Sequence, residues 1–292
     1  MVENEEKFVL VCEDRAFLKV MTETFGDDYL VESAEILKEE QTLEKYRRQV
    51  KLIVEAVPSS EKDCAFLEQK LRHFQTDEMM AFVLTCRPGQ KRLAAKMAEL
   101  EVADILFLPC EETILRKRIG NIIKLMFLKK QALRDPLTKA YNRRGFEKLV
   151  QKLLRERLEK AAFIMIDLDD FKRFNDQYGH HMGDQVLTGV VGTLEQVLDR
   201  EDVVGRMGGD EFAIFIPHVG SPEAFHQKLS LIFRQLEIQW LEEEDAVQVL
   251  SSMGISFFPE HGQNFEELYR RADEAQYRSK ADGKHRIRIY GE

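Results

Sequence analysis

The stretch RMGGDEFAIFIP, from Arg206 to Pro217, decides the fold of the C-terminal half of this 292-residue chain. Apolar residues flank a Gly-Gly-Asp-Glu sequence, so Asp202–Met207 and Phe212–Ile216 are expected to form two antiparallel strands joined by a turn. Two glycines supply a tight turn and leave the backbone bare. The carboxylates beside them favour a site where a cation bridges the turn to a phosphate group. The turn consists of Gly208, Gly209, Asp210 and Glu211.

A second acidic cluster lies earlier in the chain. Taken alone, the glycine turn is best interpreted as a polar surface turn, and it is the second acidic cluster that favours a binding site. The apolar run Ala161–Ile166 predicts a buried strand that leads directly into Asp167. Open α/β sheets bind ligands at the C-terminal ends of strands, and Mg²⁺ takes one or two carboxylates plus substrate phosphates. If this strand lies beside the hairpin, Asp167 and Asp210 can share one ion.

Five separated blocks of the C-terminal half resemble the GGDEF domain, the diguanylate cyclase module of bacterial signalling. They occur in the family's order and spacing from Asp135 to the C-terminus. The resemblance implies a nucleotidyl-cyclase-like α/β domain with a mainly antiparallel sheet. The blocks are DPLTKAYNRRGF from Asp135, IDLDDFKRFNDQYGHHMGD from Ile166, RMGGDEF from Arg206, SSMGIS from Ser251 and RADEAQYRSKADGKHR from Arg271.

This resemblance implies an enzyme that joins two GTP molecules into cyclic di-GMP and releases two pyrophosphates across a homodimer of GGDEF domains. Such phosphoryl transfer is mostly positioning and electrostatic stabilisation. By resemblance, Asp167, the Leu168 carbonyl and Asp210 hold Mg²⁺, with Mn²⁺ as an alternative ion. Asp210 and Glu211 are the implied catalytic residues, and Glu211 assists metal binding or deprotonation of the attacking 3′-hydroxyl.

The triphosphate contacts are also implied by the resemblance. Gly208 and Gly209 let the triphosphate approach the hairpin, and the backbone amides near Phe171 and Lys172 cradle the terminal phosphates at a helix start. The opening motif of the family is matched by Asp135, Asn142 and Arg143, for which a structural turn and salt-bridge role is favoured over catalysis.

Lys280 and Lys284 match a basic pair that lies near the phosphates in the family. Family members usually carry arginine at the position of Lys284 and asparagine at that of His285. Lysine keeps the charge and loses the bidentate fork, so weaker triphosphate binding is expected without loss of activity.

Asn175 and Asp184 match the positions that bind guanine in the family. The Watson–Crick edge of guanine offers two adjacent donors, and one carboxylate accepts both. Adenine would place an acceptor opposite Asp184, and sites of this kind discriminate by on the order of 10⁴. His180 matches a substrate-contacting position, and a structural histidine at a helix terminus is the alternative.

One regulatory site of the family is incomplete in this sequence. Many relatives carry an RxxD product-binding motif whose aspartate lies six residues before the first motif glycine. Asp202 is in place, but Asp199 stands at the arginine position and Arg200 comes one residue late. Product inhibition through this site is therefore expected to be absent or weak.

The N-terminal half alternates short apolar strands with helix-compatible segments, which implies a parallel, doubly wound sheet. Its order and size resemble a response-regulator receiver domain of the flavodoxin-like class, with Glu13-Asp14 at the acidic pair and Thr85 and Pro109 also matching. The expected strands start at Lys7, Lys51, Met80 and Ala103, and the expected helices include Asp63–Phe74 and Lys91–Leu100.

Two departures from the receiver pattern indicate that the usual phosphorylation chemistry is missing. Val54-Glu55 replaces the phosphoacceptor aspartate at the end of the third strand, and Leu108 replaces the lysine before Pro109. Without that lysine, an added negative charge has lost its partner. A pseudo-receiver used for dimerisation or for contact with an unidentified protein partner is the favoured interpretation, and a fixed acid at Glu55 that mimics phosphorylation is the alternative.

The segment between the halves carries Leu115, Ile119, Ile122, Met126 and Leu133 at heptad-like spacing. A helix that begins on the pseudo-receiver and ends in a two-stranded coil is favoured, and packing on the pseudo-receiver's own sheet is the alternative. The predicted organisation is a pseudo-receiver over 1–112, a helical linker over 113–134 and a GGDEF domain over 135–292.

Net charge and hydropathy exclude several classes of protein function. A net charge of −9 argues against nucleic-acid binding, and no apolar run is long enough to span a bilayer, so a cytoplasmic protein without a membrane contact is expected. The cysteines are expected to be free thiols. A catalytically weak module that binds GTP or cyclic di-GMP, and a phosphorylation-gated regulator that acts by protein contact, are the rival functions.

Overall fold

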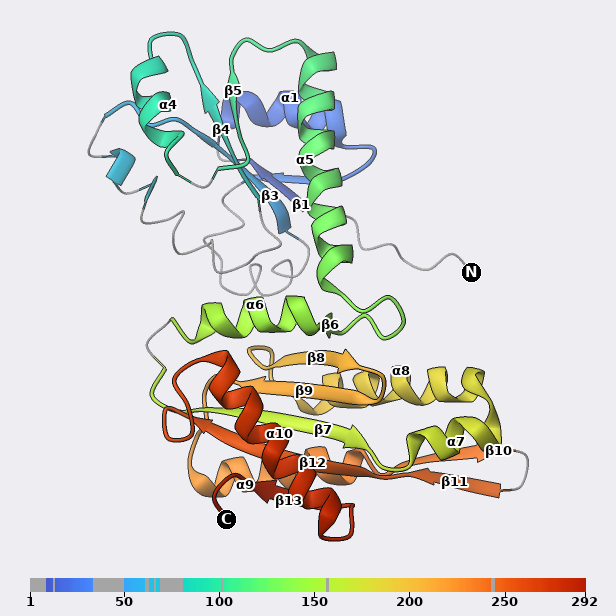
Figure 1. Ribbon diagram of the computed structural model, residues 1–292. Helices are drawn as coiled ribbons and strands as arrows, with labels where there is room; N and C mark the ends of the chain where they lie inside the picture. The colour runs from blue at the N-terminus through green and yellow to red at the C-terminus, as the bar shows by residue number, and fades with distance from the viewer. Residues whose placement is uncertain are drawn as a thin grey trace. The chain divides into compact units, whose positions relative to one another are not determined.

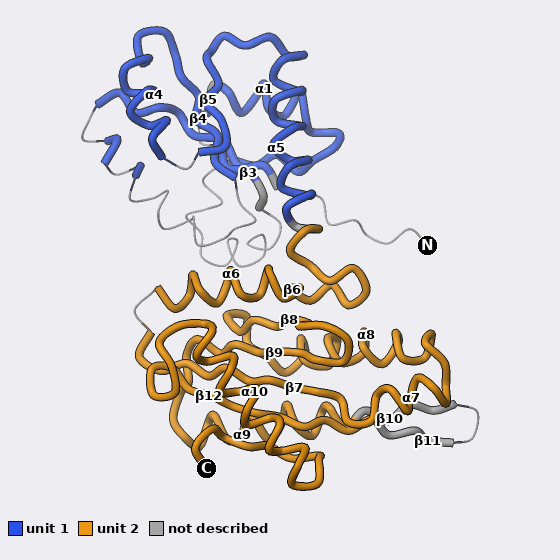
Figure 2. The backbone as a smooth tube through the Cα atoms, viewed as in Figure 1, with its two compact units in different colours: residues 1–130 blue, residues 131–292 orange. Residues whose placement is uncertain are grey.

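The structure is a computed structural model that describes residues 9–12, 14–33, 50–60, 63–65, 67–68, 81–100, 102–155, 158–242 and 245–292. It divides into two compact units, residues 1–130 and 131–292, which Figure 2 shows in different colours. The division falls inside helix α5 (Glu112–Leu133). Each unit has a sheet and hydrophobic clusters of its own.

The first unit contains a five-stranded sheet in which every pairing is parallel, with the order β2-β1-β3-β4-β5. This order is the flavodoxin-like one, so the parallel sheet predicted for the N-terminal half is confirmed. The strands are β1 (Val9–Cys12), β2 (Leu30–Ser33), β3 (Val50–Ala56), β4 (Ala81–Cys86) and β5 (Asp104–Phe107). Besides α5, the described part of this unit contains helices α1 (Arg15–Phe25) and α4 (Lys91–Met97).

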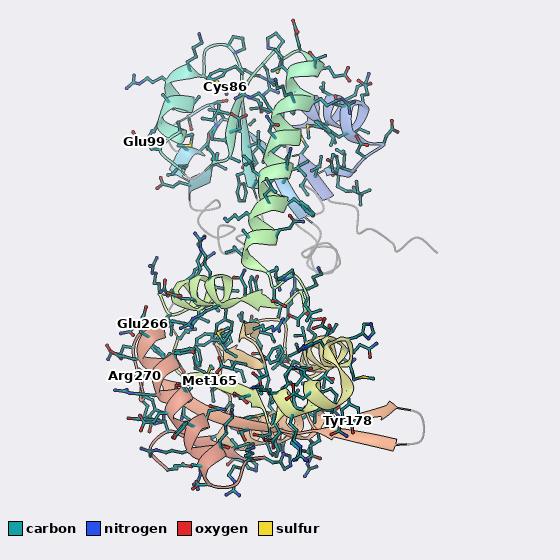
Figure 3. All side chains as sticks on the ribbon, turned by 45° about the vertical axis from the view of Figure 1, so that its right-hand side comes forward. Cys86, Glu99, Met165, Tyr178, Glu266 and Arg270 are labelled. Atoms are coloured by element: carbon teal, nitrogen blue, oxygen red, sulfur yellow. The ribbon has the colours of Figure 1, made fainter. Side chains whose placement is uncertain are left out.

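The strands of this unit read as apolar runs because helices cover both faces of a parallel sheet. All six residues of β4 are buried. Cys12, Cys64 and Cys86 are buried free thiols, as expected, and Figure 3 shows Cys86 within this unit. The sequence did not predict β2. The expected strand start at Lys7 and most of the expected helix Asp63–Phe74 lie outside the described residues.

Helix α5 is confirmed as one continuous helix of 22 residues. Leu115, Ile119 and Ile122 are buried in the core of the first unit, beside residues of β1, β3 and β4. The side chains that this helix leaves exposed are different ones, among them Leu125 and Leu128. Leu115, Ile119 and Ile122 therefore pack on the sheet of their own unit, which was the alternative to a two-stranded coil.

The second unit contains a six-stranded mixed sheet in the order β13-β12-β7-β9-β8-β6, and a separate ribbon of β10 and β11 (Figure 1). The central pairings β12–β7, β7–β9 and β9–β8 are antiparallel, which confirms the mainly antiparallel sheet. The strands are β6 (Tyr141–Asn142), β7 (Ala161–Leu168), β8 (Val203–Gly208), β9 (Glu211–Ile216), β10 (Ile238–Glu242), β11 (Asp245–Val249), β12 (Ser251–Phe258) and β13 (Ile287–Ile289). The ribbon was not predicted.

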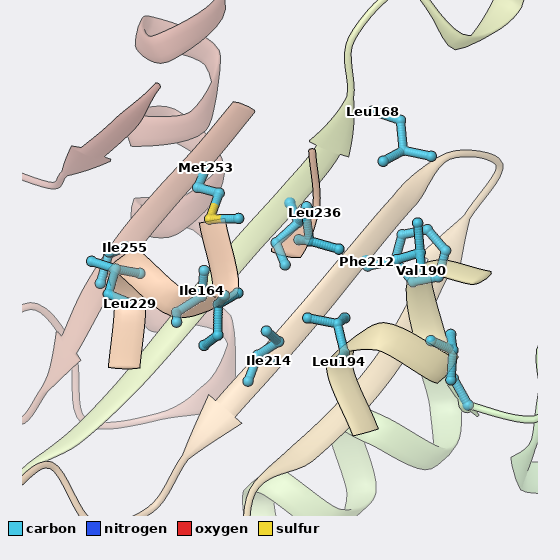
Figure 4. Packing of buried hydrophobic residues seen from close by; sticks show 14 of the residues in the cluster. Ile164, Leu168, Val190, Leu194, Phe212, Ile214, Leu229, Leu236, Met253 and Ile255 are labelled. Atoms are coloured by element: carbon cyan, nitrogen blue, oxygen red, sulfur yellow. The ribbon is translucent and has the colours of Figure 1, made fainter. Parts of the chain in front are cut away.

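The helices of the second unit cover the two faces of its sheet. They are α6 (Arg143–Leu153), α7 (Phe171–Tyr178), α8 (His180–Val197), α9 (Pro222–Gln235) and α10 (Phe265–Ala281). Side chains of β7 alternate between the faces: Ile164 packs in a cluster with α8 and α9, and Met165 in a cluster with α6 and α10 (Figures 3 and 4). Asp167 continues this alternation and falls on the α6–α10 side of the sheet.

In the described part of the chain, no helix combines the length and apolar character that a transmembrane span requires.

Candidate functional site

The predicted site forms where the end of β7 meets the start of β9. The antiparallel register pairs Asp167 directly with Glu211. The Leu168 N–H donates to the Asp210 carbonyl oxygen at 3.3 Å. Because directly paired residues of an antiparallel ladder point to the same face, the carboxylates of Asp167 and Glu211 lie side by side. The structure thus brings together the acids from the two sequence clusters.

Asp167 is the most perturbed carboxylate at this point of the sheet. Its side chain is 10% exposed, and its Oδ2 atom lies 2.6 Å from Nζ of Lys280 on α10. Its Oδ1 atom is buried and has no hydrogen-bond partner among the residues that the structure describes. Burial, opposed by Lys280 and reinforced by repulsion from Asp210 and Glu211, raises the pKa of Asp167 to about 6.

Glu211 shares this electrostatic environment. Burial raises its pKa, and the neighbouring carboxylates of Asp273 and Asp210 raise it further. The four carboxylates of Asp167, Asp210, Glu211 and Asp273 outnumber the two nearby cations, Lys280 and Arg143. This excess of negative charge is one that a divalent cation would relieve.

These residues fit a Mg²⁺ ion. The buried Oδ1 atom of Asp167 lacks a partner within the described residues, and oxygen is the ligand that Mg²⁺ prefers. The described residues contain no group of three or more His, Cys, Asp or Glu side chains arranged for a metal. An ion here would therefore take few protein ligands, as Mg²⁺ does when substrate phosphates complete its coordination.

The glycine turn is shorter than predicted, because Gly208 closes β8 and Glu211 opens β9, and these two residues pair with each other. Only Gly209 and Asp210 lie between the strands. Gly209 has a φ of +53°, in the left-handed region that glycine adopts without strain. Arg206 Nε donates to the Gly209 carbonyl at 2.9 Å, which fixes the turn against β8.

Helix α7 begins next to the end of β7. Phe171 is buried in the α8–α9 cluster and Lys172 is exposed, so the first turn of α7 is anchored by the phenyl ring. Asp170, just before the helix, has a left-handed φ of +58°. Lys284 lies 2.6 Å from the Asp170 carboxylate, and this hydrogen bond lowers the pKa of Asp170. The structure therefore brings Lys284 to the helix start and Lys280 to Asp167.

Asn175 packs against the first turn of α8. A Cβ atom on Gly183 would lie 1.9 Å from Asn175 Oδ1, so a larger residue there would displace the Asn175 side chain. That Oδ1 atom is buried and lacks a hydrogen-bond partner in the described ranges. Asp184, the next residue, is exposed, and His180 is exposed where α8 starts. The glycine thus lets the Asn175 side chain of α7 lie against the backbone of α8, at the residue before Asp184.

The residues of the opening motif have structural partners. Asp135 Oδ1 accepts from Arg206 Nη1 at 3.0 Å, which ties this segment to β8. Asn142 caps α6 by accepting from the Gly145 N–H at 2.9 Å. The Arg143 guanidinium lies over the ring of Tyr269, 5.1 Å from its centroid. These contacts agree with the structural role favoured for the motif.

Sequence reasoning missed Asp169 and Ser252. Ser252 Oγ donates to Asp169 Oδ1 at 2.8 Å, and the His285 N–H donates to Asp169 Oδ2 at 3.0 Å. The signal was a second acid two residues after Asp167 and a serine in the SSMGIS block. Neither feature indicates by itself that the two residues meet.

The two aspartates of the incomplete RxxD segment form ion pairs with a lysine from α9. Lys228 Nζ forms ion pairs with Asp202 and with Asp199, the latter at 2.5 Å. The Asp202 side chain is 3% exposed, and its Oδ2 atom also accepts from the Asp199 N–H at 2.8 Å. The carboxylate that relatives use in this motif is therefore buried and already bound to a cation.

A separate polar cluster lies at the C-terminal ends of β1 and β4 in the first unit. Arg87 Nη2 donates to both carboxylate oxygens of Asp14 at 2.7 Å, and Thr85 Oγ1 donates to Asp14 Oδ2 at 3.1 Å. Glu55 is 4% exposed, and its backbone carbonyl accepts from Thr85 at 3.3 Å. An arginine thus neutralises the buried Asp14. Glu13, the other predicted acid, lies outside the described residues.

Comparison with known proteins places the second unit in one family. The family model for the diguanylate cyclase GGDEF domain matches residues 132–286. Diguanylate cyclase DgcP of Pseudomonas aeruginosa is 33% identical over 165 residues, which cover 55% of this chain and 24% of that protein. The chain spans less than half the length of the curated relatives it matches.

Solved structures agree with the family match. The GGDEF domain of YfiN (also TpbB) from P. aeruginosa has a TM-score of 0.51 and 31% identity, covering 54% of this chain and 94% of its own. The coiled coil and GGDEF domain of DgcB from Caulobacter crescentus, solved in complex with c-di-GMP, has a TM-score of 0.51 and 25% identity, covering 68% and 98%. Together with the matched residues 132–286, these likenesses show that the chain belongs to the GGDEF-domain diguanylate cyclase family.

Proposed function

We propose that this protein is an active diguanylate cyclase, which condenses two GTP molecules into cyclic di-GMP across a dimer of its GGDEF domains. The observation that carries this proposal is the meeting of Asp167 with Glu211 at adjoining strand ends, with one buried carboxylate oxygen left without a partner among the described residues. Carboxylates whose pKa values are raised by burial and by one another cluster at catalytic sites, which favours an active enzyme over a module that only binds the nucleotide.

Residues of this chain would bind the metal ion and the triphosphate. Asp167, the Leu168 carbonyl and Asp210 would hold Mg²⁺, which when bound neutralises charge on the phosphate oxygens. The backbone of Gly208 and Gly209 leaves room for the triphosphate, and the first amides of α7 face its terminal phosphates.

Two further residues have proposed roles in the transfer. Glu211, with a raised pKa, would accept the proton of the attacking 3′-hydroxyl. Lys280, which pairs with Asp167 in this structure, would turn to the phosphates when they arrive.

Guanine recognition would come from Asn175 and Asp184. Asn175 offers an acceptor that is already desolvated and lacks a partner within the described residues, so a donor on the base gains a full hydrogen bond there. The exposed Asp184 carboxylate would accept from two adjacent donors of guanine. The proposed selectivity for GTP over ATP depends on this pair.

One assay tests the proposal. Purified protein is incubated with GTP and Mg²⁺, or with Mn²⁺, and the products are separated by chromatography, with Asp210→Ala as the inactive control. Cyclic di-GMP formed by the wild type and not by the variant supports the cyclase. GTP binding without turnover in both proteins would support the rival instead, a module that senses the nucleotide.

The ion pair between Lys228 and Asp202 in the incomplete RxxD segment leads to a prediction about product inhibition. We expect cyclic di-GMP to leave the initial rate unchanged at micromolar concentrations, because Lys228 already occupies the Asp202 carboxylate. Initial rates against added product check this, with Lys228→Ala as a variant that frees the carboxylate but restores no arginine. A stoichiometric product dimer bound at Asp202 and Arg200, seen by calorimetry, would contradict it.

The polar cluster of the first unit leads to a second prediction. A small phosphodonor such as acetyl phosphate is expected to leave the protein unmodified and its activity unchanged. Arg87 already binds the buried Asp14, and Glu55 is one methylene longer than the aspartate it replaces. Intact-mass spectrometry after incubation with Mg²⁺ and acetyl phosphate checks this, and a phosphoryl group mapped to Glu55 would refute it.

A further inference from the structure

A strained turn follows α10 and carries one of the proposed phosphate-binding lysines. Gly283, Lys284 and His285 have φ values of +110°, +63° and +46°. The glycine is accounted for by the helix end, because the Gly283 N–H binds the Lys280 carbonyl and the Lys284 N–H binds the Ser279 carbonyl. Two consecutive residues other than glycine in the left-handed region are not needed to end a helix, and they persist only where neighbouring contacts hold them.

The contacts that hold this turn come from Asp169 and Ser252. The His285 N–H donates to Asp169 Oδ2 at 3.0 Å and lies 3.1 Å from Ser252 Oγ. Ser252 itself donates to Asp169, and its side chain is fully buried. Asp169 is fixed in turn, because its N–H donates to the Leu250 carbonyl at 2.8 Å. The carboxylate of Asp169, which directly follows β7, thus fixes the backbone of the turn by accepting a hydrogen bond from the His285 N–H.

The His285 ring anchors the same turn from the other side. It stacks on Phe233 with 4.8 Å between ring centroids, and its Nε2 atom lies 3.1 Å from a carboxylate oxygen of Glu237. Between these attachments the side chain of Lys284 points back to Asp170, at the start of α7. The position of the lysine therefore depends on the turn, and the turn depends on Asp169.

We infer that Asp169 is a positioning residue of the cyclase: with Ser252, it holds the 283–285 turn in its left-handed conformation and so places Lys284 where α7 receives the terminal phosphates. This inference rests on the proposed function. It assigns Asp169 a role through Lys284 rather than through the metal, although Asp169 follows Leu168 directly in the chain.

A double-mutant cycle of Asp169→Ala and Lys284→Ala tests this coupling. Each single variant is expected to raise the KM for GTP by about 3- to 10-fold, with kcat changed less than about 2-fold, because a lysine contact to the terminal phosphates is lost. The double variant is expected to match Lys284→Ala alone. Effects that multiply, or a fall in kcat with a higher Mg²⁺ requirement, would overturn the inference and point to the metal site.

Two further variants separate positioning from general damage. Asp169→Asn keeps an acceptor for the His285 N–H, so it is expected to restore most of the wild-type KM. Asp176→Ala, an exposed acid on α7, is the matched control and is expected to leave KM unchanged.

The experiment also distinguishes the failure of this inference from that of the proposed function. The affinity for a non-hydrolysable GTP analogue is measured for every variant, in parallel with turnover. If the wild type binds the analogue but forms no cyclic di-GMP, the cyclase proposal fails and the binding cycle still tests Asp169. If turnover is present and Asp169→Ala binds the analogue as tightly as the wild type, the positioning role fails.

Discussion

Asp167→Asn is expected to lower cyclic di-GMP formation by on the order of 10³-fold while leaving the fold intact. Asparagine has the same shape, so the packing at the end of β7 is kept, but it lacks the charge that would hold Mg²⁺ beside the substrate. The measurement is the steady-state rate with GTP at saturating Mg²⁺. A variant that keeps more than a tenth of the wild-type rate would remove Asp167 from the metal site.

The same substitution is expected to stabilise the metal-free protein near neutral pH. The pKa of Asp167 is raised to about 6 in the folded state, so its ionised form is disfavoured there relative to the unfolded chain. The favourable contribution of Asp167 to the free energy of unfolding is therefore fully present below a pH of about 4 and is lost as the pH rises through about 6. Asparagine does not titrate, and its advantage should appear above this window.

Thermal unfolding in EDTA at low and at neutral pH serves as the control for Asp167→Asn. The variant should melt at a higher temperature than the wild type at neutral pH and at nearly the same temperature near pH 4. A lower melting temperature at both pH values would mean that the lost activity reflects damage to the fold. In that case the rate measurement would say nothing about the metal.

Asp184→Asn is expected to weaken the use of GTP by on the order of 10³-fold in kcat/KM. The asparagine amide still accepts one hydrogen bond, but its NH₂ group faces the second donor of the guanine edge. The same amide is complementary to adenine, which presents a donor beside an acceptor. The strong preference for GTP over ATP should therefore fall by a similar factor.

Competition assays with GTP and ATP in one mixture measure this selectivity, with separation of the cyclic products. Asp176→Asn, an exposed acid on α7, is the matched control and should keep the wild-type preference. If Asp184→Asn retains the preference for GTP, guanine is recognised elsewhere. A wild type that forms mainly a mixed dinucleotide would contradict the guanine assignment altogether.

Local features of the second unit could be predicted because they depend on residues close together in the chain. Two adjacent glycines between apolar runs specify a hairpin, and the structure shortens its turn by one residue at each side. The apolar run before Asp167 specifies a buried strand with an acid at its end, and β7 has both features. Alternation along this strand also determines which face carries the acid.

Contacts between distant residues could not be predicted in this way. The apolar residues at heptad-like spacing on α5 are an example, because this spacing fits packing against a partner helix and packing against the sheet of their own unit. Only the packed structure shows Leu115, Ile119 and Ile122 in the core of the first unit. Periodicity reports that one face of a helix is apolar, but not what covers that face.

The sequence by itself determined the two-strand scaffold, the acids at its ends and the membership of the second unit in the GGDEF family. Only the tertiary structure decided which cation each buried carboxylate meets: Lys280 for Asp167, Lys228 for Asp202 and Arg87 for Asp14. Each of these pairs joins elements far apart in the chain. Which partner reaches a buried charge depends on how helices pack over a sheet, and local sequence does not encode that arrangement.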